Sequence, residues 1–202
     1  EVTDEVGEKL KTLGSATIDS KLKHQREVLQ LLRSAGGAKL GYLLRQQIPI
    51  KLTDWDTSEL GYVEVDLVVH CGSSALGEHI NTVSTTEVSS GWWGGEAIVG
   101  KSQERTFWAL KEIRRRTPFQ WKGLDSDNGN EFINQILYKY CRKEGLEFTR
   151  SRPNRKNDDA YIEEKNWTHV RKVFGYLRHD TYEELAIMND LYHHELRLYK
   201  NF

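Results

Sequence analysis

The chain has 202 residues, of which 38% are hydrophobic and 29% are charged, and its formal net charge is -1. This balance is that of a globular protein with room for one catalytic domain, and it excludes a disordered or fibrous chain. No apolar run approaches the roughly 20 residues of a membrane span, and no secretory signal opens the sequence. Cys71 and Cys141 lie far apart, which indicates a reduced compartment such as the cytoplasm rather than a disulfide framework.

The first part of the chain predicts a helical segment followed by a linker. Residues 1–35 have leucines at helical spacing and polar residues that could cap a second helix. The two short helices could form a helix-turn-helix or a plain helical hairpin. Residues 36–59 contain Gly36-Gly37 and Pro49 and keep no sustained period, so we expect a linker there.

Residues 60–179 predict a core that alternates strands and helices. We expect strands over 61–71, 79–90, 92–100, 119–127 and 146–151, because these segments are short and rich in β-branched residues. Helices are expected over 102–117, with Ser102 as its N-cap, over 130–145, ended by Gly145, and over 157–178. A last amphipathic helix lies within 180–202. The order predicts an α/β protein with a mixed five-stranded sheet, three antiparallel strands followed by parallel additions, flanked by helices.

Two aspartates are candidate functional residues because of where they stand on predicted strands. Asp66 interrupts the apolar strand GYVEVDLVVHC, and alternation places Glu64 on the same face. Asp127 comes at the end of FQWKGLDSD, where ligands collect in open α/β sheets. Each alone has a plainer explanation, since a strand acid is commonly solvated and Asp-Asn-Gly is a good turn. Asp127 is preferred over Asp125 because it stands at the strand end.

A third acid stands on the predicted helix 157–178. Asp159, Glu163 and Asn166 share one helical face, while Glu164 points roughly 100° away. Carboxylates from two strands and a helix could hold two Mg²⁺ ions about 4 Å apart, the arrangement that activates one oxygen and stabilises another in phosphodiester chemistry. No histidine or cysteine ligand is needed.

Basic residues cluster around this helix. The run RSRPNRK at 150–156 is followed by Lys165 and Arg171. Such a run is either a solvated face or a surface for DNA phosphates. The predicted DNA-binding residues are Arg152, Arg155, Lys156, Lys165, Asn166 and Arg171, and Trp167 could stack on a base or pack at an interface.

Together these motifs resemble the retroviral-type integrase core, and more closely the bacterial insertion-sequence transposases that contain it. The segments that carry the resemblance are YVEVDLVVHCG, GLDSDNGNEFIN and FTRSRPNRKNDDAYIEEKNW, and 35 residues separate Asp127 from Glu163. The resemblance implies a ribonuclease H-like fold and an acidic triad of Asp66, Asp127 and Glu163 that binds Mg²⁺ or Mn²⁺. It implies hydrolysis at transposon ends and strand transfer into target DNA, by a homodimer or higher multimer in the bacterial cytoplasm or nucleoid.

The chain departs from the family at three places. Asp159 stands where asparagine is usual, GGAKLG at 36–41 replaces the expected linker sequence, and a C-terminal domain would ordinarily follow Phe202. Two alternatives therefore stay open. One is a ribonuclease H-like nuclease acting on RNA–DNA hybrids, and the other is a truncated, non-catalytic DNA-binding regulator.

Overall fold

The computed structural model describes residues 44–51, 58–152 and 160–202. The predicted helical segment 1–35 lies outside these ranges, as do Arg155, Lys156 and Asp159. Within the described chain, five strands form one sheet: β1 (Tyr62–Val69), β2 (Ile80–Glu87), β3 (Trp93–Val99), β4 (Gly123–Ser126) and β5 (Glu147–Arg150).

The sheet is mixed, as the sequence predicts. Its strand order is β3-β2-β1-β4-β5. Strands β1, β2 and β3 pair antiparallel, whereas β4 pairs parallel with β1 and β5 parallel with β4. The predicted fold class is therefore confirmed, and the parallel pairing of β1 with β4 puts their carboxyl ends at the same edge.

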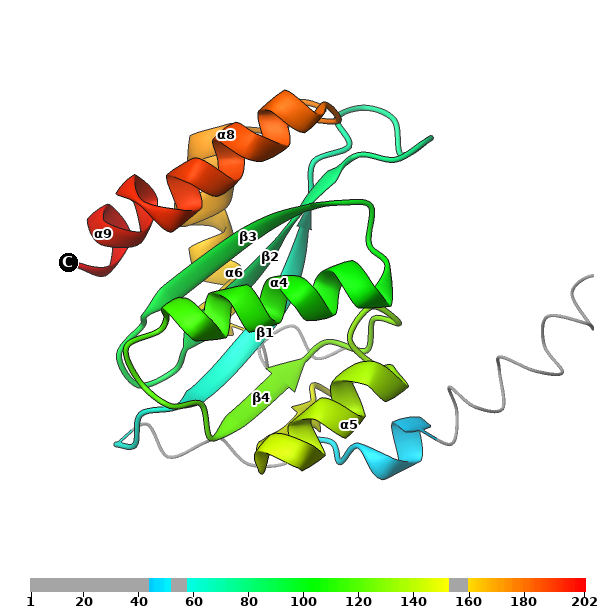
Figure 1. Cartoon of the computed structure of the whole chain (residues 1–202), viewed down its shortest axis with the longest axis vertical. Coiled ribbons are helices and arrows are strands. Elements are labelled where there is room, and N and C mark those ends of the chain that lie inside the picture. The colour runs from blue at the N-terminus through cyan, green and yellow to red at the C-terminus, as the bar shows by residue number, and fades with distance from the viewer. Residues whose placement is uncertain (1–43, 52–57, 153–159) are drawn as a thin grey trace, which may run out of the picture. The chain divides into compact units, whose positions relative to one another are not determined.

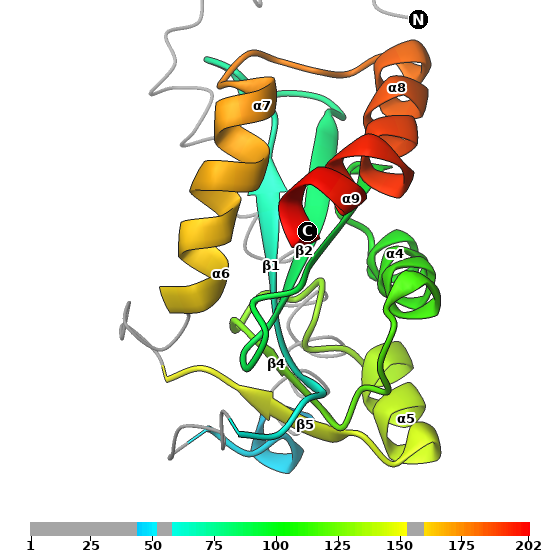
Figure 2. The ribbon, with the colours of Figure 1, turned by 90° about the vertical axis from the view of Figure 1, so that its left-hand side faces the viewer.

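Helices cover both faces of this sheet (Figures 1 and 2). Helices α4 (Gln103–Arg116) and α5 (Gln135–Glu144) lie on one face, and the helical run of α6 (Ala160–Lys165), η3 (Asn166–Arg171) and α7 (Lys172–Phe174) lies on the other. The larger hydrophobic core lies under α4 and α5 and includes Val63, Val65, Leu110, Ile113 and Phe132. Because Val63 and Val65 face this core, alternation turns Glu64 and Asp66 toward α6.

A smaller core lies on the α6 side and is closed by the C-terminal helices. Helices α8 (Tyr182–His193) and α9 (Glu195–Asn201) pack there, and Met188 and Tyr192 join Trp93 and Val170. The Tyr192 hydroxyl hydrogen-bonds Thr82 Oγ1, which also contacts Nε2 of the buried His70. A buried polar chain thus ties α8 to β1 and β2.

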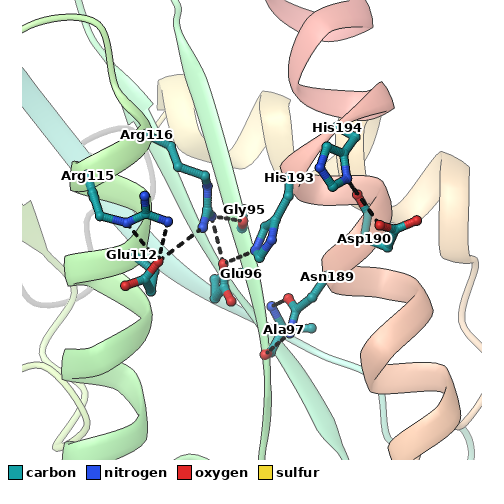
Figure 3. A network of polar contacts seen from close by, with 10 residues as sticks. All are labelled: Gly95, Glu96, Ala97, Glu112, Arg115, Arg116, Asn189, Asp190, His193 and His194. Carbon is teal, nitrogen blue, oxygen red and sulfur yellow. Dashed lines mark hydrogen bonds and ion pairs between the residues drawn. The ribbon is translucent and has the colours of Figure 1, made fainter.

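The outer edge of β3 is covered by side-chain amides. Asn189 Oδ1 accepts the Ala97 backbone N–H at 2.7 Å and its Nδ2 donates to the Ala97 carbonyl at 3.0 Å. Asn201 makes the same pair of bonds with Trp93. Between these two positions, Arg116 donates to the Gly95 carbonyl, and Figure 3 shows this contact beside the Asn189–Ala97 pair. Each amide reproduces the hydrogen bonds of a neighbouring strand, so the edge is not left free to pair with another chain.

Several helix boundaries differ from the sequence prediction. Helix α5 begins at Gln135 rather than at 130, because the Asn134 side chain caps it by accepting the Leu137 N–H. The run predicted over 157–178 ends at Gly175, whose φ of 70° breaks the helix, and it contains the π-helical segment η3. The helix expected within 180–202 is two helices, because His194 leaves the helical conformation with φ -116° and ψ -91°.

Part of the predicted linker packs into the core. Residues 44–47 form a helical turn, Leu44 and Ile48 are buried, and Ile50 bridges Arg150 on β5. The Lys51 N–H donates to the Arg150 carbonyl at 3.0 Å. This segment therefore lies along the β5 edge as an added piece of the sheet. Across 44–51, 58–152 and 160–202, no helix combines the length and the apolarity that crossing a membrane requires.

Candidate active site

Asp66 lies in the middle of β1, on the sheet face that α6 covers. Its Oδ1 accepts the Leu67 N–H and its Oδ2 accepts Asn166 Nδ2, both at 2.7 Å. Burial raises the pKa of Asp66 above its ordinary value, and the carboxylates of Asp127 and Glu163 raise it further. The two hydrogen bonds oppose this rise. Both other predicted acids are therefore close enough to act on Asp66.

Asp127 follows β4 and comes alongside Asp66 because of the parallel register. Glu64 pairs with Asp125 and Val65 with Ser126, so the next pair along would be Asp66 with Asp127. The Asp127 Oδ1 accepts the Gly129 N–H at 2.9 Å. Burial raises the pKa of Asp127. The half-buried carboxylate of Asp127 therefore lies beside β1, at the end of β4.

A fourth carboxylate stands beside Asp127. Glu131 raises the pKa of Asp127, whereas Lys101 lowers it. A Cβ placed on Gly129 would lie 2.9 Å from Asp127 Oδ1 and 2.8 Å from Glu131 Cδ, so a larger residue there would require one of these side chains to shift. Sequence reasoning did not single out Glu131. Its place four residues after Asp127, across the Asn-Gly turn, is the signal that could have done so.

Glu163 lies on α6 and is exposed, while its neighbour Ile162 is fully buried. The Ile162 N–H donates to Glu64 Oε2 at 3.2 Å, which fixes this turn of the helix over β1. One turn later Asn166 reaches Asp66, so Glu163 and Asn166 face the same carboxylate from one helix. Glu164 is also exposed, and helical geometry points it about 100° away.

The helix changes character at Asn166. Residues Asn166–Arg171 form a π-helix, in which the bonds close over five residues and which is frequent at functional sites. The segment buries His169 and Val170 against the sheet and leaves Trp167 half-exposed. Asn166 Oδ1 is buried and makes no hydrogen bond.

The oxygen donors of this region fit a hard divalent cation. Three carboxylates and the unpartnered Asn166 Oδ1 are the ligand atoms that Mg²⁺ prefers. They are not a compact cluster, however. Within the part of the chain that the structure describes, one set of three ligand atoms lies within 4.8 Å of one another, and it is the exposed Asp190, His194 and Glu195 on α8 and α9. Asp66, Asp127 and Glu163 are spaced more widely than that.

The described residues among the predicted DNA-binding set lie in different surroundings. Arg152 is exposed, and Lys165 lies near the Gly91 turn, its Nζ 3.7 Å from the place of a Cβ on that glycine. The Arg171 guanidinium lies 4.8 Å from the centroid of the Tyr176 ring. Asn166 is engaged with Asp66 rather than free to contact a ligand through its Nδ2.

One curated protein of unknown function is similar in sequence to the whole chain. The chain is 36% identical over 204 residues to the uncharacterized protein y4rM of Sinorhizobium fredii (strain NBRC 101917 / NGR234). That alignment covers the whole chain but 57% of the relative, so the chain spans little more than half of its length. No family model matches the sequence.

Two solved structures resemble the fold. One is a chain of the simian T-cell lymphotropic virus intasome in complex with the PP2A regulatory subunit B56 gamma, with a TM-score of 0.53 and 12% identity over 73% of this chain and 53% of that one. The other is the catalytic core domain of BIV integrase, with a TM-score of 0.46 and 16% identity over 57% of this chain and 70% of that one. The first likeness and the strand order show a ribonuclease H-like fold.

Proposed function

We propose that this chain is the catalytic core of a DDE transposase or integrase of the bacterial insertion-sequence type. Asp66, Asp127 and Glu163 are the proposed catalytic residues and metal ligands, and two Mg²⁺ or Mn²⁺ ions are the proposed cofactors. One observation carries the proposal. In a ribonuclease H-like fold, the parallel register of β1 and β4 brings Asp127 beside Asp66, and Asn166, on the same helical run as Glu163, hydrogen-bonds Asp66. Three carboxylates from two strands and a helix therefore come together in one region.

The wide spacing of the three acids suits two cations better than one. Two ions about 4 Å apart need one shared carboxylate between them and further ligands on either side. Asp66 would be the shared ligand, because the charges of both Asp127 and Glu163 raise its pKa. When bound, such ions supply an activated attacking oxygen and a stabilised leaving oxygen.

The residues around the triad orient it. Asn166 and the Leu67 N–H each hold one oxygen of Asp66, and the Gly129 N–H holds Asp127. These donors fix the carboxylate planes before any substrate arrives, which is how neighbouring hydrogen bonds tune a metal site.

DNA is the proposed partner, held along the outer side of the α6–α7 run. The exposed aromatic side chains there are Tyr161, Trp167 and Tyr176, and Lys165 and Arg171 stand among them. Cations bind phosphates and aromatic faces stack on bases. Arg171→Ala should lower the slope of log affinity against log salt by about one, and an unchanged slope would remove Arg171 from the interface.

The test of the proposed chemistry compares two neighbouring acids. The whole chain is incubated with Mn²⁺, a labelled duplex with a free 3′-hydroxyl and a supercoiled plasmid, and joined products are measured. Glu163→Gln should abolish joining and weaken Mn²⁺ binding, measured by calorimetry. Glu164→Gln, a matched change on the next residue, should retain both.

Other outcomes would replace this proposal. Activity retained by Glu163→Gln and lost by Glu164→Gln would reassign the third acid. Cleavage of the RNA strand of a hybrid without any DNA joining would favour a ribonuclease. DNA binding that ignores Mn²⁺ and survives all three acid substitutions would favour a non-catalytic regulator.

A further inference from the structure

A buried group of charged side chains lies beneath the three acids. Lys51 Nζ lies 3.3 Å from Glu64 Oε1 and 3.7 Å from Asp125 Oδ2. The exposed fractions of the three side chains are 9%, 2% and 0%. Thr149 Oγ1 donates to the other oxygen of Asp125. We call Lys51, Glu64 and Asp125 the buried ion cluster.

The buried ion cluster touches every element that carries a proposed metal ligand. Glu64 is two residues before Asp66 on β1, and Asp125 is two residues before Asp127 on β4. Glu64 Oε2 accepts the N–H of Ile162, the residue next to Glu163 on α6. Because Glu64 and Asp125 pair directly across β1 and β4, the cluster joins the three elements at one level of the sheet.

Lys51 lies on the segment that runs along the β5 edge of the sheet. Its backbone N–H donates to the Arg150 carbonyl, and the Arg150 N–H donates to the Pro49 carbonyl, each at 3.0 Å. The backbone of residues 49–51 is therefore fixed along β5, and the ammonium group reaches inward to two carboxylates. A lysine on a loose loop could not set such a position.

Stability alone is a weak reason for such a group. Burying ions costs desolvation that their attraction recovers only in good geometry, and well-packed apolar residues commonly do as well. Buried ionic groups can instead select one arrangement among several. Here the arrangement selected is the seating of α6 on β1, because one oxygen of Glu64 binds the helix backbone while the other binds Lys51.

We propose that Lys51, Glu64 and Asp125 are positioning residues that align the three metal-binding acids. Glu64 seats the first described turn of α6, so that Glu163 and Asn166 meet Asp66. Lys51 holds Glu64 and Asp125 in register, and so sets the separation of Asp66 and Asp127. This role rests on the proposed function, since it concerns the metal site of that reaction.

The test separates positioning from ordinary stabilisation. Lys51→Met removes the charge but keeps most of the side-chain length, and Lys51→Arg keeps the charge. Leu110→Ala, in the core on the opposite sheet face, is a control whose loss of thermal stability does not pass through the buried ion cluster. Mn²⁺ affinity, thermal midpoint and hydrogen exchange of the Ile162 amide are measured on the whole chain.

We expect Lys51→Met to weaken Mn²⁺ binding by about 10-fold or more, the usual effect of losing a residue that orients a metal ligand. Exchange of the Ile162 amide should accelerate by a similar factor. Lys51→Arg should restore most of both, and Leu110→Ala should bind Mn²⁺ as the wild type does. If Lys51→Met does not fold, Glu64→Gln tests the same contact, because it keeps an oxygen for Ile162 while losing the charge.

Two failures are distinguishable. Wild-type Mn²⁺ affinity in folded Lys51→Met or Glu64→Gln overturns the positioning role and leaves the proposed function standing. A wild-type chain that binds no Mn²⁺ refutes the proposed function, and the positioning role with it.

Discussion

Replacing Asn166 by leucine tests how far the proposed metal site depends on a single amide. Asn166 Nδ2 lies 2.7 Å from Asp66 Oδ2 and is one of two hydrogen-bond donors to this carboxylate. A hydrogen bond to a charged group contributes about 1.5–3 kcal/mol. Since about 1.4 kcal/mol corresponds to a tenfold change in affinity, losing it should weaken Mn²⁺ binding by about 10- to 100-fold.

The same substitution should change the free energy of unfolding much less. Asn166 Oδ1 is buried without a hydrogen bond, and such a group costs about 1–3 kcal/mol. Leucine removes this cost together with the bond to Asp66, so the two effects on folding largely offset each other. Affinity and stability should therefore separate in one variant.

Calorimetric titration with Mn²⁺ and urea unfolding, both on the whole chain, measure the two quantities. Thr168→Ala is the matched control, because it removes a side-chain hydrogen bond of the same helix, from Thr168 Oγ1 to the Glu164 carbonyl, without touching Asp66. Equal Mn²⁺ affinity in Asn166→Leu and wild type would refute the idea that Asn166 orients Asp66. A large loss of stability with unchanged affinity would make Asn166 a structural residue only.

Two further predictions concern the charge of the site and the edge of the sheet. The pKa of Asp66 is raised by burial, so the folded chain binds more protons than the unfolded chain between the ordinary value of 3.8 and the raised value, and the contribution of Asp66 to stability falls as pH rises through that window. Without divalent ions, Asp66→Asn should therefore unfold at higher urea than wild type at neutral pH, with the difference shrinking as pH approaches 3.8, and a difference that grows toward acid would contradict the sign. At the β3 edge, Asn189→Leu leaves the Ala97 N–H and carbonyl without two bonds of about 1 kcal/mol each, so we expect a loss of about 2 kcal/mol in urea unfolding and concentration-dependent association by light scattering, whereas Asp190→Ala on the same helix should do neither.

Much of the fold could be predicted because its signals are local. The alternation of GYVEVDLVVHC specifies β1 and the faces of its side chains, and the Ser102 cap and the Gly145 stop of the α4 and α5 helices are confirmed. Asp127 could be preferred over Asp125 because a strand end is visible in the sequence. The structure adds that Asp125 is fully buried against Lys51 and Thr149.

The features that escaped prediction depend on partners far away in the chain. Nothing near Lys51 indicates that it meets Glu64 and Asp125, because that contact exists only once residues 49–51 lie along β5. The π-helix that begins at Asn166 contains Val170, which is buried in the smaller core, and the break at His194 separates two helices that each hydrogen-bond β3. Local propensity describes a continuous helix in both places, and tertiary packing decides otherwise.

The pKa values of three carboxyl groups in this region are shifted in the same direction. Burial raises the pKa of Asp66, of Asp127 and of Glu64, and for Asp66 and Asp127 neighbouring acids add to the effect. A fold selected for stability alone would exchange these carboxylates for apolar or amide side chains, because each unneutralised charge weakens the folded state. Four acids nevertheless stand close together on adjacent strands: Glu64 and Asp66 on β1, Asp125 on β4 and Asp127 just after it. The buried Lys51 lies between Glu64 and Asp125. Lys51 offsets one of the two charges of Glu64 and Asp125. Under the proposed function, divalent cations would offset the charges of Asp66 and Asp127.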